Sequence, residues 1–348
     1  MASQSTAKSL FLFILKLVIA GVIVYYLLLR DPGEIMRCLK HIDGKYVLAA
    51  AVLYFLHMAA AAVRWGCLVK IPGLRISWFE VISLSMQGYF FSLVIPGGAI
   101  GGDVVKMGVL SQRTPKGEKF EGIFSILMDR IIGMIALFVM ALCLIPLNIP
   151  VLLNLDIPGL PRGNAVNQLL LAGLILLCLG GLAASCVIFF HRPLSRIFVF
   201  SKLMQYGDKL SHGMVSRMTS ATDTYSSDLK ALSLLTLFSV FAVHLLTALP
   251  VFLLLEGMGV ACSLNTVITA LTIGNIIGLI PLFPAGLGGR DLTAVAILTA
   301  GGIAGADAKT ALLVYSAILL LVSLAAGLFF IFDRGRRQTN GELEKKNE

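Results

Sequence analysis

The sequence predicts an all-α polytopic membrane protein made of two inverted repeats, each of three full spans plus one broken re-entrant helical hairpin. Three observations predict this class. Hydrophobic residues make up 57% of the 348 residues and charged residues only 14%, whereas soluble domains average about 45–50% and about 25%. Apolar runs of about 20 residues, the length that crosses a bilayer as a helix, recur along the chain. Two further apolar segments, 77–110 and 264–301, are each interrupted by a similar Pro/Gly motif.

Six apolar runs are long enough to be full spans. They cover approximately residues 10–29, 46–69, 122–146, 167–190, 231–255 and 308–332. The first run ends at Leu29-Arg30-Asp31-Pro32 without a small-residue cleavage site, so we expect a retained span rather than a signal peptide. Residues 1–348 are therefore interpreted as a single transmembrane domain that ends in a short polar tail, 334–348.

Each interrupted segment is predicted to be a re-entrant hairpin. The first reads PGGAIGGD from Pro96 and the second reads PAGLGGRD from Pro284. Proline removes a helix hydrogen-bond donor and glycine destabilises a helix interior, so neither segment is expected to continue as one helix. Non-helical backbone at membrane depth is tolerated only where protein or a wet cavity surrounds it. The predicted backbone and hinge positions are Pro96, Gly98, Gly101, Gly102, Pro284, Gly286, Gly288 and Gly289.

The two motifs indicate a duplication. Aligned on proline, they match in two glycines and in the aspartates Asp103 and Asp291. The neighbouring spans follow in the same order at nearly the same offset, so repeat one covers about 8–147 and repeat two about 165–333. Three full spans per repeat is an odd number, and the second repeat is therefore predicted to be inverted in the membrane.

The distribution of basic residues predicts the orientation. Six lysines and arginines lie within 191–230 and five in the C-terminal tail, whereas 147–166 contains Arg162 alone. By the positive-inside rule, the first two regions are cytoplasmic and the third is external. We therefore expect a multi-pass plasma membrane protein with both termini in the cytoplasm. The loop 30–45 contradicts the rule, because it is placed outside and yet carries four basic residues.

Ionisable residues in the apolar segments are the candidates for substrate contact. A charged side chain at the bilayer centre costs about 2.5–3.5 kcal/mol on insertion scales, so such residues are usually paired or line a polar path. Asp129 and Arg130 are adjacent and point to different faces of one predicted helix, so each is expected to find a partner elsewhere. For Lys106 and Arg290, snorkelling to the interface is an equal alternative. The predicted substrate-binding residues are Lys106, Arg130, Arg290, Asp103, Asp129 and Asp291.

Other polar residues in the spans have simpler interpretations. Arg64-Trp65 is interpreted as an interfacial anchor, the typical use of such a pair. His57 and His244 are expected to be hydrogen-bonded packing residues rather than a proton relay. The polar residues before the second motif, Asn265, Thr269, Thr272 and Asn275, could line a groove or join helices.

Several functional classes lack their motifs in this sequence. The six cysteines form no CxxC pair and no metal-ligand spacing, so they are expected to be buried hydrophobes, with no metal and no cofactor. No Lys/Arg face with interleaved aromatic residues indicates nucleic-acid binding. No GxxxxGK[ST] motif occurs, so direct drive by ATP is not expected.

Four motifs in order resemble the lysylphosphatidylglycerol synthase transmembrane family, whose members are also described as flippase-like integral membrane proteins. They are Arg64-Trp65, FFSLVIPGGAIGGDVVK from Phe90 to Lys106, DRIIG from Asp129 to Gly133, and PLFPAGLGGRD from Pro281 to Asp291. The resemblance covers nearly the whole chain. It implies a polytopic domain that moves lipids between leaflets, fused in some members to an aminoacyl transferase and linked in others to polyprenyl-phosphate sugars.

The sequence departs from the family pattern at several positions. Asp291 stands where Glu is common, and Lys106 stands where Arg is common, which loses the bidentate fork of the guanidinium. Ser316 follows Tyr315, where the family often has a basic residue. A symmetric clamp of two arginines is therefore not expected. The short sequence after Phe332 indicates no aminoacyl transferase, so the resemblance does not imply synthase activity for this chain.

The sequence leaves three functions open. The first is a lipid translocase, not an enzyme, which moves an anionic or aminoacylated phospholipid, or a lipid-phosphate, between leaflets. The second is a membrane-embedded transferase acting on a polyprenyl-phosphate or phospholipid, although no DDxxD-like carboxylate cluster for a metal is present. The third is a scaffold for such an enzyme. The expected partners are membrane lipids and a separate lipid-modifying enzyme, with the oligomeric state open.

Overall fold

The computed structural model describes residues 33, 36–37, 40, 42–95, 99–157, 161, 163–279 and 288–331. Within these ranges the chain forms helices and connecting loops without a strand, which confirms the all-α prediction. Four of the predicted hinge residues lie outside the described residues, namely Pro96, Gly98, Pro284 and Gly286. The predicted span 10–29 and the polar tail also lie outside them.

Five helices of the described residues are long and apolar enough to cross a membrane. They are Gly44–Lys70 (α3), Lys119–Leu144 (α6), Asn164–Phe189 (α8), Leu229–Gly257 (α12, η3 and α13) and Gly305–Ile331, of which α16 is Gly305–Ala325. They confirm the five predicted full spans between residues 46 and 332. The chain is therefore an integral multi-pass membrane protein.

The two interrupted segments form helix pairs. Their arms are α4 (Trp78–Val94) with α5 (Ala99–Arg113), and α14 (Leu264–Gly278) with α15 (Gly289–Ala300). The arms of each pair pack against each other along their length. α4 begins with a capping box in which the Ser77 hydroxyl accepts from the Glu80 amide and the Glu80 carboxylate accepts from the Ser77 amide. Glu80 therefore stabilises a helix start.

Glycine permits the close crossing within each pair. A Cβ added at Gly102 on α5 would overlap the carbonyl oxygen of Gly88 on α4. In the second pair, a Cβ added at Gly274 would lie 2.8 Å from the carbonyl oxygen of Arg290. Both crossings bring backbone against backbone, as small residues allow in membrane helix packing.

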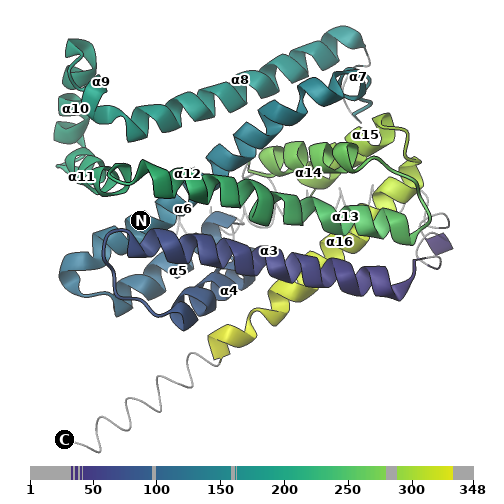
Figure 1. Ribbon diagram of the computed structural model, residues 1–348, viewed down its shortest axis with the longest axis horizontal. Coiled ribbons are helices and arrows are strands. Elements are labelled where there is room, and N and C mark those ends of the chain that lie inside the picture. Colours follow the sequence, from purple (N-terminus) through teal and green to yellow (C-terminus); the bar gives the residue numbers. More distant parts are fainter. Residues whose placement is uncertain are drawn as a thin grey trace, which may run out of the picture.

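The two pairs lie toward opposite ends of the long helices (Figure 1). The chain connectivity agrees, because three spans, α6, α8 and α12–α13, separate the first pair from the second. An odd number of crossings places the loops that flank the two pairs on opposite sides. This placement accords with the two halves being inverted relative to each other, which stays a prediction.

Short helices connect the spans. They are η1 (Lys116–Glu118), η2 (Pro146–Asn148), α7 (Ile149–Leu152), α9 (His191–Leu194), α10 (Phe198–Leu210) and α11 (Met214–Ser226). α9, α10 and α11 lie at the same end of the bundle as the first hairpin (Figure 1). Asp208 fixes the turn from α10 to α11, because its carboxylate accepts from the amide of Ser216 at 2.7 Å and from its hydroxyl at 2.6 Å.

The largest buried core lies between α3, α13, α14, α15 and α16. α8 lies at the edge, beside α6, with little of its length buried (Figure 1). Polar side chains on α14 join helices within this core. Asn148 donates to Thr269 at 2.9 Å, and Asn275 donates to Thr247 at 3.1 Å. These bonds support the interpretation that the polar residues of this arm hold helices together.

A π-helical turn, η3 (Ser239–His244), interrupts the fourth described span. Nδ1 of His57 on α3 lies 3.0 Å from the carbonyl oxygen of Val243. Nε2 of His244 lies 2.9 Å from the carbonyl oxygen of Gly133. Each ring nitrogen donates to a carbonyl of another helix. Both histidines are therefore hydrogen-bonded packing residues, as expected from the sequence.

Candidate functional site

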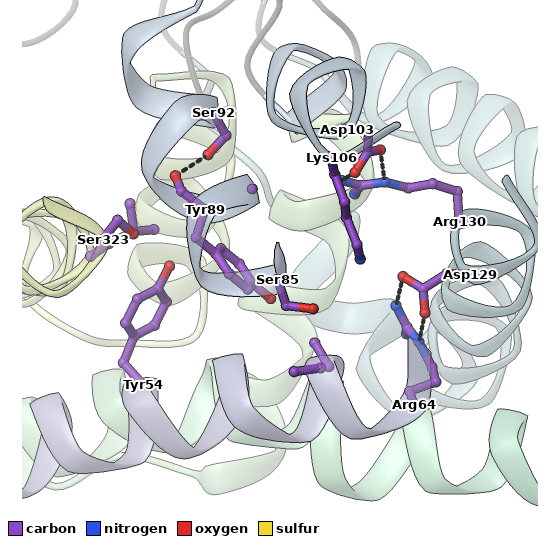
Figure 2. Close-up of a pocket in the computed structure, with 14 residues that line it drawn as sticks. Tyr54, Arg64, Ser85, Tyr89, Ser92, Asp103, Lys106, Asp129, Arg130 and Ser323 are labelled. Atoms are coloured by element: carbon purple, nitrogen blue, oxygen red, sulfur yellow. Dashed lines mark hydrogen bonds and ion pairs between the residues drawn. The ribbon is translucent and has the colours of Figure 1, made fainter. Parts of the chain in front are cut away.

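A polar cavity of about 190 Å³ opens between α3, α4, α5, α6 and α16 (Figure 2). The lining is Tyr54, Ala61, Ala62, Arg64, Ser85, Gly88, Tyr89, Ser92, Asp103, Lys106, Asp129, Arg130, Leu319 and Ser323. Four of the six predicted substrate-binding residues therefore line one cavity, namely Asp103, Lys106, Asp129 and Arg130.

Asp129 on α6 pairs with Arg64 on α3. Nε of Arg64 donates to one carboxylate oxygen at 2.8 Å and Nη2 donates to the other at 3.1 Å. Nη1 of Arg64 donates to the Ser239 hydroxyl at 3.3 Å. The Arg64 side chain is only 8% exposed, so this two-point pair is enclosed by protein and joins α3, α6 and the π turn.

Arg130 pairs with Asp103 on α5. Its Nε and Nη2 donate to the two carboxylate oxygens at 2.5 and 2.9 Å. The Arg130 side chain is 43% exposed, so it faces the open part of the cavity. Asp129 and Arg130, although adjacent, are thus bound to different helices, which confirms that each has a partner elsewhere.

Lys106 is the third cation of the cavity. Its Nζ lies 3.4 Å from the centre of the Trp65 ring, a cation–π contact, and the residue is buried. No carboxylate of the described residues forms an ion pair with it. Figure 2 shows its ammonium between the Arg130–Asp103 pair and Asp129. Lys106 therefore does not snorkel away from the cavity but contributes its charge there.

The interpretation of Arg64-Trp65 as an interfacial anchor is wrong. Trp65 is fully buried, and its Nε1 donates to the Ser125 hydroxyl at 3.1 Å. Gly133 on α6 leaves room for the guanidinium, because a Cβ there would lie 2.9 Å from Nη1 of Arg64. The sequence signal for the role of Arg64 was Asp129, because a carboxylate inside an apolar run requires a cation as its partner.

Arg290 and Asp291 lie in a second buried cluster, at the start of α15. Nε of Arg290 donates to Asp291 at 2.7 Å and Nη2 donates to the Ser316 hydroxyl at 2.7 Å, while that hydroxyl donates to Asp291 at 2.9 Å. The guanidinium carbon lies 4.9 Å from the centre of the Tyr315 ring. These two predicted site residues join α15 to α16, and neither lines the polar cavity.

The described glycines of the two motifs lie at helix starts. Gly101 and Gly102 belong to the first turn of α5, next to Asp103, and Gly289 is the first residue of α15. Gly288 precedes it with φ +94°, a left-handed conformation that favours glycine. The positive end of the α5 dipole therefore lies at the cavity beside Asp103.

The structure offers no metal site within its described ranges, where no group of three His, Cys, Asp or Glu side chains comes together. Five cysteines of these ranges are free. Cys178 is buried as expected, whereas Cys143 and Cys186 are exposed on the outer faces of α6 and α8, contrary to the expectation of buried cysteines. Apolar side chains on outer faces are ordinary where lipid is the solvent.

The known proteins that are similar to this chain are membrane proteins. Residues 13–327 match the family described as the Lysylphosphatidylglycerol synthase TM region. The chain is 23% identical over 296 residues to a UPF0104 membrane protein of Pyrococcus horikoshii, covering 82% of this chain and 87% of that one. It is 21% identical over 322 residues to a UPF0104 membrane protein of Methanothermobacter thermautotrophicus, covering 90% and 93%.

Proposed function

This chain belongs to the Lysylphosphatidylglycerol synthase TM region family, and from that premise we propose that it is a lipid translocase. It moves a phospholipid or lipid-phosphate with an anionic headgroup between the leaflets of the plasma membrane. Transport rather than catalysis is its role, with membrane lipids as substrates. Both termini lie in the cytoplasm, where a separate lipid-modifying enzyme can supply or consume the transported lipid.

The charge of the polar cavity carries this proposal. Three cations and two carboxylates line it, and the carboxylates are bound to Arg64 and Arg130. One positive charge, that of Lys106, remains without an ion-pair partner among the described residues. A buried charge inside a membrane bundle is costly unless an opposite charge joins it. A phosphodiester brings one negative charge and therefore completes the cavity.

The surrounding groups suit a phosphate. Arg130 can share its guanidinium with a phosphate oxygen, because this side chain faces the opening and planar guanidinium groups bind phosphate through two donors. Asp103 and Lys106 lie near the N-terminal end of α5, whose helix dipole is positive there. Ser85, Tyr89 and Ser92 supply further polar groups on α4. Together these replace the water that a headgroup loses in the bilayer.

Movement between leaflets requires alternating exposure. Broken helices at a repeat interface and rocking of one repeat against the other are the usual means in secondary transporters. The first hairpin holds Asp103 and Lys106 on α5, so a shift of α5 against α6 moves these two residues together and separates Asp103 from Arg130. The second hairpin is held to α16 by the hydrogen bond from Arg290 to Ser316.

Leaflet exchange in liposomes tests the proposal. The purified protein is reconstituted with labelled anionic, zwitterionic and aminoacylated phospholipids and a polyprenyl phosphate. Wild type should accelerate exchange of the anionic lipids, and Lys106→Gln should reduce the rate by roughly tenfold or more, because a charge-assisted bond is lost. Lys106→Arg should retain part of the rate. Lys45→Gln is the matched control, since that lysine is 72% exposed outside the cavity.

Three outcomes contradict the proposal. Equal exchange with and without protein for all four lipids would remove the translocase function. Metal-dependent chemical turnover of a lipid by the purified protein would favour the transferase. A phenotype that persists in Lys106→Gln but disappears on changes in the loops would favour the scaffold.

A further inference from the structure

A second cavity, an apolar groove of about 520 Å³, runs along the outer seam between α3 and α16. Every side chain that lines it is apolar. The lining includes Ala51, Val52 and Phe55 on α3, Val322 and Ala325 on α16, and Phe329 in the same span after α16. Val52 and Phe55 are about half exposed, so the groove is open to the surroundings of the bundle. The small side chains of the alanines leave open the space that forms the groove, which larger side chains would fill.

The groove adjoins the polar cavity. Tyr54 and Ser323 line the polar cavity, and their sequence neighbours Phe55 and Val322 line the groove. Both Tyr54 and Ser323 are buried, and Figure 2 shows them at the same edge of the cavity, remote from Arg130. The two helices α3 and α16 therefore present polar atoms on one side of this edge and an apolar trough on the other.

We propose that the groove holds a hydrocarbon chain of the same lipid whose phosphate occupies the polar cavity. The inference rests on the proposed function and extends it to a second part of the ligand. A phosphate in the cavity must carry its chains out toward the membrane, and the α3–α16 seam is an apolar route that begins at the cavity edge. The adjacent cavities thus match the two chemical halves of one amphiphile.

The groove contributes selection rather than driving force. Bulk lipid is as apolar as the groove, so entry of a chain gains no hydrophobic free energy inside a bilayer. What remains is van der Waals contact, which depends on shape. The chain held in the groove fixes the orientation of the glycerol or prenyl linkage relative to Lys106, and filling the groove should lower the rate of transport without weakening the binding of a free headgroup.

Photolabelling tests the occupant directly. The probe is an anionic phospholipid with a diazirine in one acyl chain, in liposomes that contain the full-length protein. Peptides with residues 51–55 and 322–329 should be labelled more strongly than the lipid-facing peptide 169–177 of α8. Ala325→Phe should reduce labelling of the groove roughly fivefold, because it fills the space, and Lys106→Gln should reduce it as well.

The matched control is Ala184→Phe. Ala184 on α8 and Ala325 on α16 are both exposed alanines of apolar spans, so neither substitution is expected to impair folding. Ala184→Phe should leave labelling and transport unchanged, whereas Ala325→Phe should slow exchange of a long-chain lipid. Binding of glycerol phosphate to the purified protein, followed by thermal shift, should be the same in both variants, since it reports the polar cavity alone.

The outcomes separate this inference from the proposed function. Equal labelling of α8 and the groove, or groove labelling that neither Ala325→Phe nor Lys106→Gln reduces, overturns the inference even if transport is observed. Labelling of residues 10–29 in place of the groove walls would assign the groove to the chain's own predicted span and also overturn it. Groove labelling that depends on Lys106 in a protein that moves no lipid would leave the lipid site standing and remove the translocase.

Discussion

Arg64 and Asp129, 65 residues apart in the sequence, form a two-point ion pair between α3 and α6. Both side chains are largely enclosed, at 8% and 14% exposure. Arg64 also donates to Ser239 in the π turn, so the pair ties together three parts of the bundle. The pair joins helices and is largely enclosed, whereas the Arg130 side chain is 43% exposed at the open part of the cavity.

We expect Arg64→Leu to be strongly destabilising. It leaves the buried Asp129 carboxylate without its partner, and breaking a buried pair in this way costs about 3–5 kcal/mol. Arg130→Leu should cost less, because that side chain is 43% exposed. Thermal unfolding in detergent measures both. The double variant Arg64→Leu/Asp129→Leu should be more stable than Arg64→Leu alone. If its loss of stability equals the sum of the losses in the two single variants, the two residues are not coupled.

Gly102→Ala should separate the arms of the first hairpin. The added methyl group overlaps the Gly88 carbonyl oxygen, and backbone cannot yield as a flexible side chain does. Gly108→Ala is the control on the same helix, because a Cβ there meets nothing within 4 Å. It should be neutral or stabilising by up to about 1 kcal/mol through helix propensity. Melting temperature and lipid exchange report both variants, and equal behaviour would refute the close crossing.

The turn between α10 and α11 should lose its hydrogen bonds to the Asp208 carboxylate only at acid pH. Hydrogen bonds from the hydroxyl and amide of Ser216 hold the pKa of Asp208 below its usual value of 3.8. A lowered pKa in the folded state means that the stabilisation is present above the unfolded value and is lost as the pH falls through the lowered one. Amide hydrogen exchange of Ser216 should therefore stay protected from neutral pH to about pH 4 and lose protection below it.

Asp208→Ala is the comparison for this corner. It should remove the protection of the Ser216 amide at every pH, while amides within α8 keep theirs. Protection in wild type that is the same at acid and neutral pH would show that the Asp208 carboxylate does not hold the turn.

Single cysteines can test the inverted arrangement. Arg75 lies before α4 and Ala304 lies after α15, and both are exposed in loops. In a background without the native cysteines, an impermeant maleimide applied to intact cells should label Ala304→Cys. It should label Arg75→Cys only after permeabilisation. Labelling of both from the same side would refute the opposed hairpins and, with them, the inverted repeats.

The periodic features of the fold could be predicted from the sequence, because they depend on local composition. The span expected at 46–69 is Gly44–Lys70, and the span expected at 231–255 is Leu229–Gly257. The two breaks were predicted from proline and glycine, and the described arms of both hairpins follow that prediction. These features need only the length of an apolar run and the residues that end it.

The arrangement of the cavity could not be predicted in the same way. The sequence indicated that Asp129 needs a partner, but not that Arg64 is that partner, since nothing local marks a contact between two spans. The stacking of Lys106 on Trp65 and the role of Tyr54 at the cavity edge depend likewise on how α3, α5 and α16 meet. The π turn Ser239–His244 lacks proline and glycine, so no local signal announces it.

The π turn sets how the two ends of this span are rotated relative to each other. A π turn accommodates one residue more than an α turn, and its closing bond here runs from the Leu245 amide to the Val240 carbonyl. Converting it to α geometry would rotate one end of the span against the other by about 100°. Ser239 and the Val243 carbonyl could not then both reach Arg64 and His57. The hydrogen bonds from Arg64 and His57 on α3 therefore depend on the π geometry of this turn, which fixes the rotation of one end of the span relative to the other.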